Sequence, residues 1–385
     1  MRCLVGSEWG AERKALKSIY TGLIRSVFDY GSIVFGSASE TLLKKLDSIQ
    51  YQALRLCTGA VRTTPTSAFL IEMGEMPLNL RRLQLKSNYW CNLKGHDGNH
   101  PCQDILKSSW EKEKKKLNSF GWEIENVIKD FGLSDINISQ TVPLSTVYPS
   151  LFHNNVVDLT LLEKRKGENI SDPYLVQSYL DSKYYGYVQV FTDASKNSNS
   201  SNGVIVCSDS SSSLYSLKNN HAISRPDLLL EIQLITYRIQ AMGLLVIFTW
   251  IPSHIGIRGN ELADKYAKQA SKYSDIDILV PFSREEIKSI IKQKVKERWQ
   301  RQWEEDRTGR WLYSIQRKVG AMRRTGQNRK EETVISRLRF GHTRLNSNLF
   351  KIGKHRTGSC DFCGQEETVK HVLLFCTKYS DYLLK

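Results

Sequence analysis

Short apolar runs alternate with helical patterns between residues 187 and 270, and this order constrains the fold more than any other feature of the chain. Helical spacing covers residues 228–239 and again residues 260–270. Three runs have the length and β-branched content of strands: residues 188–191, 204–207 and 244–250. The last run is continuous enough to predict a strand buried on both faces. The order strand, strand, helix, strand, helix predicts an α/β domain over residues 187–272.

Three aspartates lie near the ends of these elements: Asp193, Asp209 and Asp264. Ligands of parallel sheets collect at the carboxyl ends of the strands, and clustered carboxylates there can hold Mg²⁺ or Mn²⁺ for phosphodiester hydrolysis. Each residue also has a simpler interpretation. Asp193 and Asp209 could start turns, and Asp264 could pair with Lys268 one helical turn further on. Taken singly, the three aspartates do not identify a catalytic site.

The C-terminus carries a metal-ligand spacing, Cys-x2-Cys-x7-His-x4-Cys, formed by Cys360, Cys363, His371 and Cys376. Two thiolates three positions apart can hold one ion, and a later His and Cys complete a tetrahedron, so the spacing predicts structural Zn²⁺. The alternative is accidental clustering of cysteines in a reducing compartment. His355 is a competing ligand, but it precedes the first cysteine and would break the spacing.

Positive charge is concentrated between Pro281 and Ser359, where Lys and Arg outnumber Asp and Glu by 21 to 8, although the whole chain carries only +15. A nucleic acid partner explains this concentration, and a set of solvated helices is the alternative. Aromatic residues interleave with the charges. Three of them are candidates for stacking on bases, or else for the core: Trp303, Trp311 and Phe340.

Residues 11–90 predict a helical packing module, because Leu16, Ile19, Leu23 and Val27 recur at helical spacing. Residues 95–186 are polar and irregular, with one helical candidate at residues 105–120, and we interpret them as a connector. No run approaches the roughly 18 apolar residues that a membrane-spanning helix needs. Charges also interrupt the first ten residues, where a secretory signal is apolar. We therefore expect an intracellular protein, in the nucleus or cytoplasm, with no membrane partner and an oligomeric state that the sequence leaves open.

Three segments, VFTDAS, CSDSSSSL and WIPSHIGIRGNELADKYAKQA, occur in this order. They resemble the first, third and last acidic motifs of type 1 ribonuclease H domains, as carried by LINE-type (non-LTR) retrotransposons. The resemblance implies that Asp193, Asp209 and Asp264 are magnesium ligands and that His254 assists proton transfer and product release. It also implies endonucleolytic hydrolysis of the RNA strand of RNA–DNA hybrids.

Both ends of the chain resemble the same family. LKSIYTGLIRSVFDYGS, LDSIQYQALRLCTGAVRTTP and GEMPLNLRRLQL resemble the stretch that follows the polymerase palm of LINE-type reverse transcriptases. The Asp-Asp pair of the palm occurs nowhere in the chain, so we expect no polymerase activity. A basic helical segment followed by a CCHC zinc knuckle ends many polyproteins of this family.

The chain departs from the ribonuclease H pattern between Asp193 and Asp209. In the family, two further strands and a helix with a catalytic glutamate lie between these aspartates; here only 15 residues do, and none is acidic. The first strand should then have an uncovered edge, and hydrolysis should be slow or absent. Asp227 or Glu231 could replace the glutamate, but both lie on a helix that starts after a separate loop, and Glu231 shares that helix with leucines that must face the core.

These observations predict an α+β multidomain protein in five parts. Residues 1–94 are a helical remnant, 95–186 a connector, 187–272 a shortened ribonuclease H-like domain, 273–358 a basic helical region and 359–385 a zinc knuckle. The preferred function is that of a retrotransposon-derived ribonuclease H-type protein impaired by loss of its glutamate. The alternative is a non-catalytic zinc-knuckle protein that binds an RNA–DNA hybrid, RNA or DNA. A translated pseudogene without a selected role is a third interpretation, and the pattern does not decide whether the chain is an enzyme.

Overall fold

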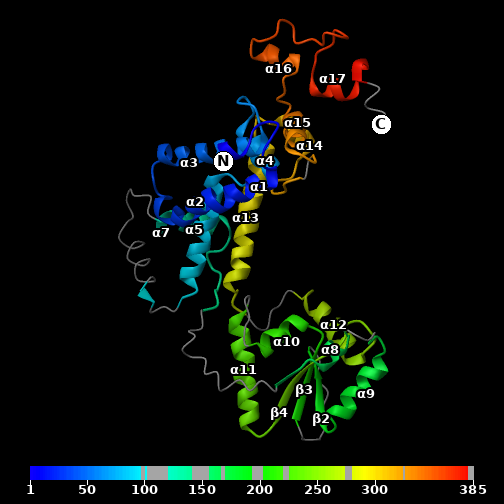
Figure 1. Cartoon of the computed structure of the whole chain (residues 1–385). Helices are drawn as coiled ribbons and strands as arrows, with labels where there is room; N and C mark the ends of the chain where they lie inside the picture. Colours follow the sequence, from blue (N-terminus) through cyan, green and yellow to red (C-terminus); the bar gives the residue numbers. More distant parts are fainter. Residues whose placement is uncertain are drawn as a thin grey trace. The chain divides into compact units, whose positions relative to one another are not determined.

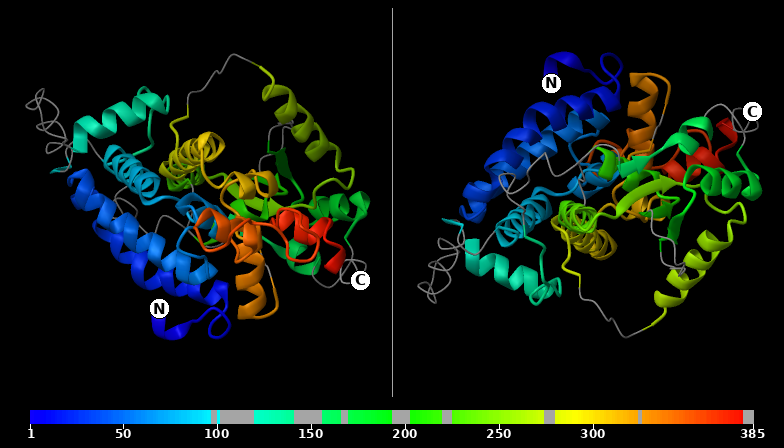
Figure 2. Two further views of the ribbon diagram at one scale, coloured as in Figure 1. Left: turned by 90° about the horizontal axis from the view of Figure 1, so that it is seen from above. Right: turned by 90° about the horizontal axis from the view of Figure 1, so that it is seen from below.

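The structure is a computed structural model that describes residues 1–96, 100–101, 120–140, 156–165, 170–192, 203–219, 225–273, 280–323 and 326–379. The chain divides into two compact units, each described here by itself (Figures 1 and 2). The helical unit comprises Met1–Leu93, Pro101–Asp135 and Ile287–Lys385. The sheet unit comprises Lys94–His100 and Ile136–Glu286, so its sequence is inserted between segments of the helical unit.

The sheet unit contains four parallel strands in the order β1-β4-β3-β2. Figure 1 shows β2, β3 and β4 side by side. They are β1 (Val157–Asp158), β2 (Tyr187–Phe191), β3 (Gly203–Ser208) and β4 (Leu245–Trp250). The three strands predicted from apolar runs are confirmed as β2, β3 and β4. β2 lies at the edge of the sheet, as the short spacing after it predicts. β4 is less buried than predicted, because Leu245 at its start is exposed.

The helices of the sheet unit are α8 (Thr160–Arg165), α9 (Pro173–Lys183), α10 (Ser211–Lys218), α11 (Pro226–Ala241) and α12 (Arg258–Ala270). The helices predicted at residues 228–239 and 260–270 are confirmed as α11 and α12. α10 was not predicted. Ser210 precedes it as the N-cap, and the Ser210 side chain accepts a hydrogen bond from the Ser213 backbone N–H, so the serine run caps a helix as well as ending a strand.

Much of the stretch that the sequence analysis interprets as a connector belongs to the core of the sheet unit. One buried cluster contains Ile205 of β3 together with residues of this stretch: Leu161 of α8, Val176 and Leu180 of α9, and Tyr184 directly after α9. The α9 residues recur every four positions, and the helix starts with an Asp172 cap followed by Pro173, which are ordinary helix signals. The connector interpretation is therefore wrong for these residues; the candidate helix at residues 105–120 lies almost wholly outside the described residues.

The helical unit is built from both ends of the chain. Its N-terminal elements are α1 (Arg13–Ile19), η2 (Tyr20–Arg25), α2 (Ser26–Phe35), α3 (Glu40–Thr58), α4 (Thr66–Met73) and α5 (Leu78–Lys94), followed by α7 (Phe120–Asp130). Its C-terminal elements are α13 (Arg284–Glu305), α14 (Arg310–Ile315), α15 (Arg329–Phe340), α16 (Asn346–Lys351) and α17 (Val369–Leu374). α15 contacts both α3 and α4. The regions 1–94 and 273–358, treated as separate in the sequence analysis, thus fold largely as one unit.

A buried ion network joins the two ends. The Glu72 carboxylate of α4 accepts from the Arg13 Nη1 atom of α1 at 2.8 Å and from the Arg339 Nε atom of α15 at 2.9 Å. The Glu72 side chain is fully buried. Arg329, also of α15, donates to the backbone carbonyls of Cys57 and Leu56 at the end of α3. Such groups are costly to bury unless every charge is paired, so they fix how the helices meet. Among the described residues, no helix is long and apolar enough to cross a membrane.

Candidate metal centre and acidic site

The predicted ligands of the C-terminal motif come together in the structure. One donor atom from each of Cys360, Cys363, His371 and Cys376 lies within 4.8 Å of the other three. The Cys363 Sγ atom is 3.2 Å from the His371 Nε2 atom, and the Cys360 and Cys376 Sγ atoms are 3.9 Å apart. Three of the four residues are buried, and only Cys363 is exposed. This Cys3His cluster can hold a metal ion and is compatible with a zinc site.

Local backbone chemistry shapes the cluster. The chain turns tightly after Cys360, because the Gly364 N–H donates to the Cys360 carbonyl at 2.8 Å and the Cys360 N–H donates to the Gln365 carbonyl at 2.7 Å. Gly364 has a φ of 73°, which a residue without a β-carbon adopts at little cost. The Thr368 hydroxyl then caps α17 by accepting from the His371 N–H at 3.1 Å. That cap sets where His371 lies on the first turn of the helix.

The thiols of the cluster differ in acidity. Backbone hydrogen bonds from Cys363 and Phe362 lower the pKa of the Cys360 thiol to about 6, whereas burial raises the pKa of Cys376. Cys360 is therefore more ready than Cys376 to bind a cation as thiolate at neutral pH. His355 stays outside the cluster, because its Nδ1 atom accepts a hydrogen bond from the Gly358 N–H at 3.0 Å.

The acidic site is assembled only in part. Asp209 follows β3, where its backbone carbonyl accepts from the Trp250 indole at 3.1 Å and its Oδ2 atom accepts from the Asn260 Nδ2 atom at 3.4 Å. The end of β3 thus contacts the end of β4 and the first turn of α12. Asp193 lies outside the described residues, so its place in the site stays a prediction.

Asp264 has different neighbours. Its Oδ2 atom lies 3.5 Å from the Nδ1 atom of His254, and donor atoms of His254, Glu261 and Asp264 lie within 4.8 Å of one another. Asp209 does not belong to this cluster. Glu261 was not predicted, although it stands three residues before Asp264 on α12 and so shares its face. His254 has a φ of 56°, and its side chain is 69% exposed.

These donors do not fit a pair of magnesium ions. Magnesium takes oxygen ligands, whereas one of the three groups in this cluster, His254, is an imidazole, which suits transition metals better. The suggested replacement ligands do not join the described site either. Asp227 forms an ion pair with Arg225, at 2.8 Å between Oδ2 and Nη2, and Glu231 is exposed. Burial raises the pKa of Asp227, but the hydrogen bond and the charge of the Arg225 guanidinium lower it more, so this pKa lies below its usual value.

Some arginine side chains of the basic region bond to groups inside the helical unit and are not available to bind phosphates. Arg337 of α15 donates to the Gly59 carbonyl at 2.8 Å, and Arg329 and Arg339 are held as described above. Trp303 and Phe340 are buried, so for these two residues the core alternative holds. Trp311 is partly exposed, and its indole donates to the Leu338 carbonyl. Exposed basic side chains remain along α13 and beyond it: Lys292, Lys296, Arg301, Arg307, Arg317 and Lys318.

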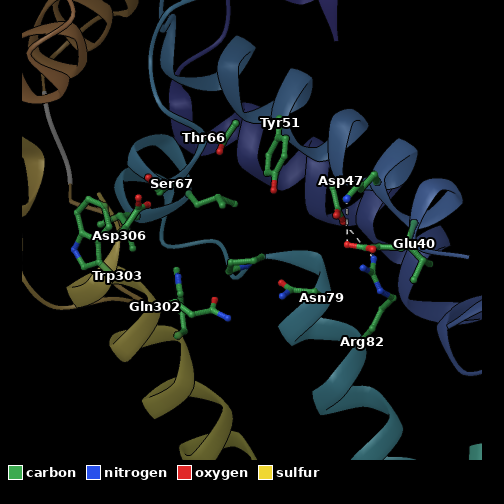
Figure 3. A pocket seen from close by; sticks show the side chains of 16 residues that line it. Glu40, Asp47, Tyr51, Thr66, Ser67, Asn79, Arg82, Gln302, Trp303 and Asp306 are labelled. Carbon is green, nitrogen blue, oxygen red and sulfur yellow. Dashed lines mark hydrogen bonds and ion pairs between the residues drawn. The ribbon is translucent and has the colours of Figure 1, made fainter. Parts of the chain in front are cut away.

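A separate pocket of about 430 Å³ lies in the helical unit between α3, α4, α5 and α13 (Figure 3). Its charged groups largely satisfy one another: Arg82 pairs with Asp47 at 3.3 Å, and Lys44 pairs with Glu40 at 3.1 Å. Asp306 accepts from the backbone and hydroxyl of Thr308. Among the described residues, none of the predicted metal ligands lines this pocket, and its paired charges do not define one chemical class of ligand.

Comparison with protein-family models, with curated proteins and with solved structures found no match to the chain. The functional assignment therefore rests on the residues and the geometry described above.

Proposed function

We propose that the chain is a LINE-type retrotransposon-derived protein whose sheet unit is a shortened type 1 ribonuclease H domain. The contact between two of the quoted motifs carries this proposal. CSDSSSSL spans the end of β3 and the start of α10, and WIPSHIGIRGNELADKYAKQA runs from the end of β4 through α12. Asp209 of the first motif is hydrogen-bonded to Trp250 and Asn260 of the second, although 41 and 51 residues separate them. Motifs that belong to one active site in the family are thus neighbours in this fold.

The proposed reaction class is hydrolysis of the RNA strand of RNA–DNA hybrids, and this chain should perform it slowly or not at all. Three acids confine two divalent cations less well than four, and among the described residues Asp209 and Asp264 belong to different side-chain clusters.

Binding of nucleic acid is the second proposed function, and the Cys3His cluster favours it. A structural zinc ion held by Cys360, Cys363, His371 and Cys376 would keep the C-terminal segment folded, with a binding free energy on the order of 10 kcal/mol for sites of this kind. The exposed Lys and Arg side chains of α13 and of the loop after α14 supply positive charge for phosphates. RNA–DNA hybrid, RNA and DNA all offer this backbone.

A cleavage assay tests the ribonuclease H proposal. The full chain, an Asp209→Asn variant and an Asp264→Asn variant are incubated with a labelled RNA–DNA hybrid and Mg²⁺ or Mn²⁺. We expect no cleavage above the rate of the variants, because the cation site is incomplete. Cleavage by the parent that both substitutions abolish would show an intact site and would contradict the expected loss of activity.

The same samples test the lineage separately. We expect the parent to bind the hybrid and Asp209→Asn to bind with nearly the same affinity, since one carboxylate contributes little to phosphate binding. Absence of binding to hybrid, RNA and DNA alike would overturn both parts of the proposal.

A further inference from the structure

The helical stretch formed by η2 and α2 presents an apolar surface outward. Four side chains make up this surface, which we call the α2 stripe, and they are 71, 67, 94 and 83% exposed: Leu23, Val27, Tyr30 and Val34. Leu23 and Val27 continue the helical spacing that Leu16 begins, but Leu16 is buried whereas they are exposed. The cause is that η2 is π-helical, and its wider turn rotates the residues after it relative to the register of α1. Single exposed apolar residues are common, but four on one helix face mark an interaction site.

The inward side of the same stretch is charged, and its ion pairs fix the orientation of the helix. Arg25 pairs with the buried Glu75 at 2.6 Å, between Nη1 and Oε2. Asp29 accepts from Arg81, whose Nη2 atom is 2.8 Å from its Oδ2 atom. Ser32, one helical turn further on, is buried. Rotation of α2 to bury its apolar residues would break these pairs and bury charges without partners, which costs several kcal/mol. The α2 stripe therefore stays outward unless another surface covers it.

The spacing of the stripe indicates what covers it. Within α2, Val27, Tyr30 and Val34 are three and four positions apart, which is the alternation of the two core positions in a heptad, and Leu23 of η2 precedes Val27 by four positions. Val27 and Val34 take the position that favours β-branched residues in two-stranded packing, and Leu23 and Tyr30 take the other. The flanking positions are occupied by uncharged residues, Ile24, Ser26, Gly31 and Ile33, so two identical helices meet no charge repulsion there.

We propose that two copies of the chain pair through the α2 stripe, a property independent of the proposed function. From typical side-chain areas, the four residues offer roughly 500 Å² per copy, so a symmetric pair buries about 1,000 Å², at the lower limit of specific interfaces. A symmetric contact needs no surface beyond this one, since each copy supplies both halves. Tyr30, the most exposed of the four and one of the two central residues, is the expected energetic anchor.

Sedimentation velocity over a concentration series tests the pairing on the full chain with zinc in the buffer, after high-salt purification has removed nucleic acid. We expect a monomer–dimer equilibrium that changes little with salt, because the interface is apolar. Tyr30→Glu should weaken the association by about thirtyfold or more, as expected for loss of a central anchor. Tyr185→Glu is the matched control, since Tyr185 is 85% exposed in the sheet unit, and it should leave the dimer intact.

Several results would overturn the proposal. A parent chain that stays monomeric at all concentrations would do so, as would a Tyr30→Glu variant that dimerises like the parent. Should Tyr30→Glu also lower the melting temperature, the milder pair Val27→Thr with Val34→Thr keeps side-chain shape and must still weaken dimerisation. Association that disappears on nuclease treatment would show that nucleic acid, which the proposed function invokes, bridges the copies instead of α2.

Discussion

Asp158 joins three elements of the sheet unit through one carboxylate. It ends β1, its Oδ1 atom accepts from the Thr160 N–H of α8, and its Oδ2 atom accepts from Lys183 of α9 at 2.8 Å and from the Tyr184 hydroxyl. Burial opposes ionisation, but these donors together hold the pKa of Asp158 well below its usual range. The residue therefore stabilises the fold as a carboxylate.

The sign of the pH dependence follows from that depressed pKa. The stabilisation is fully present above the pKa of the unfolded chain, about 4, and is lost as the pH falls further towards the folded-state value. We expect Asp158→Asn to lower the free energy of unfolding by about 2 kcal/mol at pH 7, as for loss of charged hydrogen bonds. Below pH 4 the variant should lose less stability than the parent, because it has no carboxylate at this position to protonate. Urea denaturation followed by circular dichroism at pH 7 and pH 3 measures both. Asp181→Asn, at an exposed position of α9, is the control, and equal effects of the two variants would contradict this account.

The sequence shows some of the site residues at this scale and conceals others. The spacing of Cys360, Cys363, His371 and Cys376 is local, so it predicts the cluster that the structure contains. Glu261 and Asp158 were missed. The role of Asp158 depends on Lys183 and Tyr184, which lie 25 and 26 residues away and which no short spacing connects to it.

Between elements, the Glu72 carboxylate connects α1, α4 and α15. Replacement by Glu72→Gln would leave Arg13 and Arg339 sharing a neutral amide in a buried site. We expect this variant to destabilise the helical unit by about 3 kcal/mol or more, since breaking a buried ion pair leaves charge uncompensated. The transition measured by tryptophan fluorescence in urea should shift accordingly.

Glu40→Gln serves as the matched control for that measurement. Glu40 also pairs with a basic residue, Lys44, but both side chains are largely exposed, and such pairs contribute roughly 0.5 kcal/mol or less. Similar shifts for the two variants would mean that the ion network does not hold the ends of the chain together.

The periodicity of apolar residues predicted the bounds of the helices and strands better than it predicted which of their faces are buried. The runs that became β2, β3 and β4 and the patterns that became α11 and α12 lie within a few residues of their predicted bounds. The apolar spacing from Leu16 to Val27 predicted helix, but it does not show that Leu16 is buried and Val27 exposed, because the π-helical η2 changes the register between them. The spacing of apolar residues in the sequence does not reveal such a local change in helix winding.

For the whole molecule, the main difference from the sequence-based picture is that the helical unit is discontinuous. Arg13 and Glu332 are hydrogen-bonded across 319 residues, and Arg329 reaches the end of α3 across 272. Local patterns carry no information about contacts at such separation, so residues 1–94 and 273–358 were assigned to separate parts. One consequence is that the basic region has a folded support made by the N-terminal helices.

The affinity of the full chain for an RNA–DNA hybrid, measured by fluorescence anisotropy over a series of salt concentrations, tests the central claim that the basic region and the metal-binding C-terminal segment together bind nucleic acid. We predict that affinity falls steeply as salt rises, because phosphate contacts release counterions, and that Cys363→Ser or zinc chelation weakens binding by about tenfold or more. Cys3→Ser, at an exposed cysteine outside the cluster, should bind like the parent. Equal binding by the Cys363→Ser and Cys3→Ser variants, with little dependence on salt, would contradict the account.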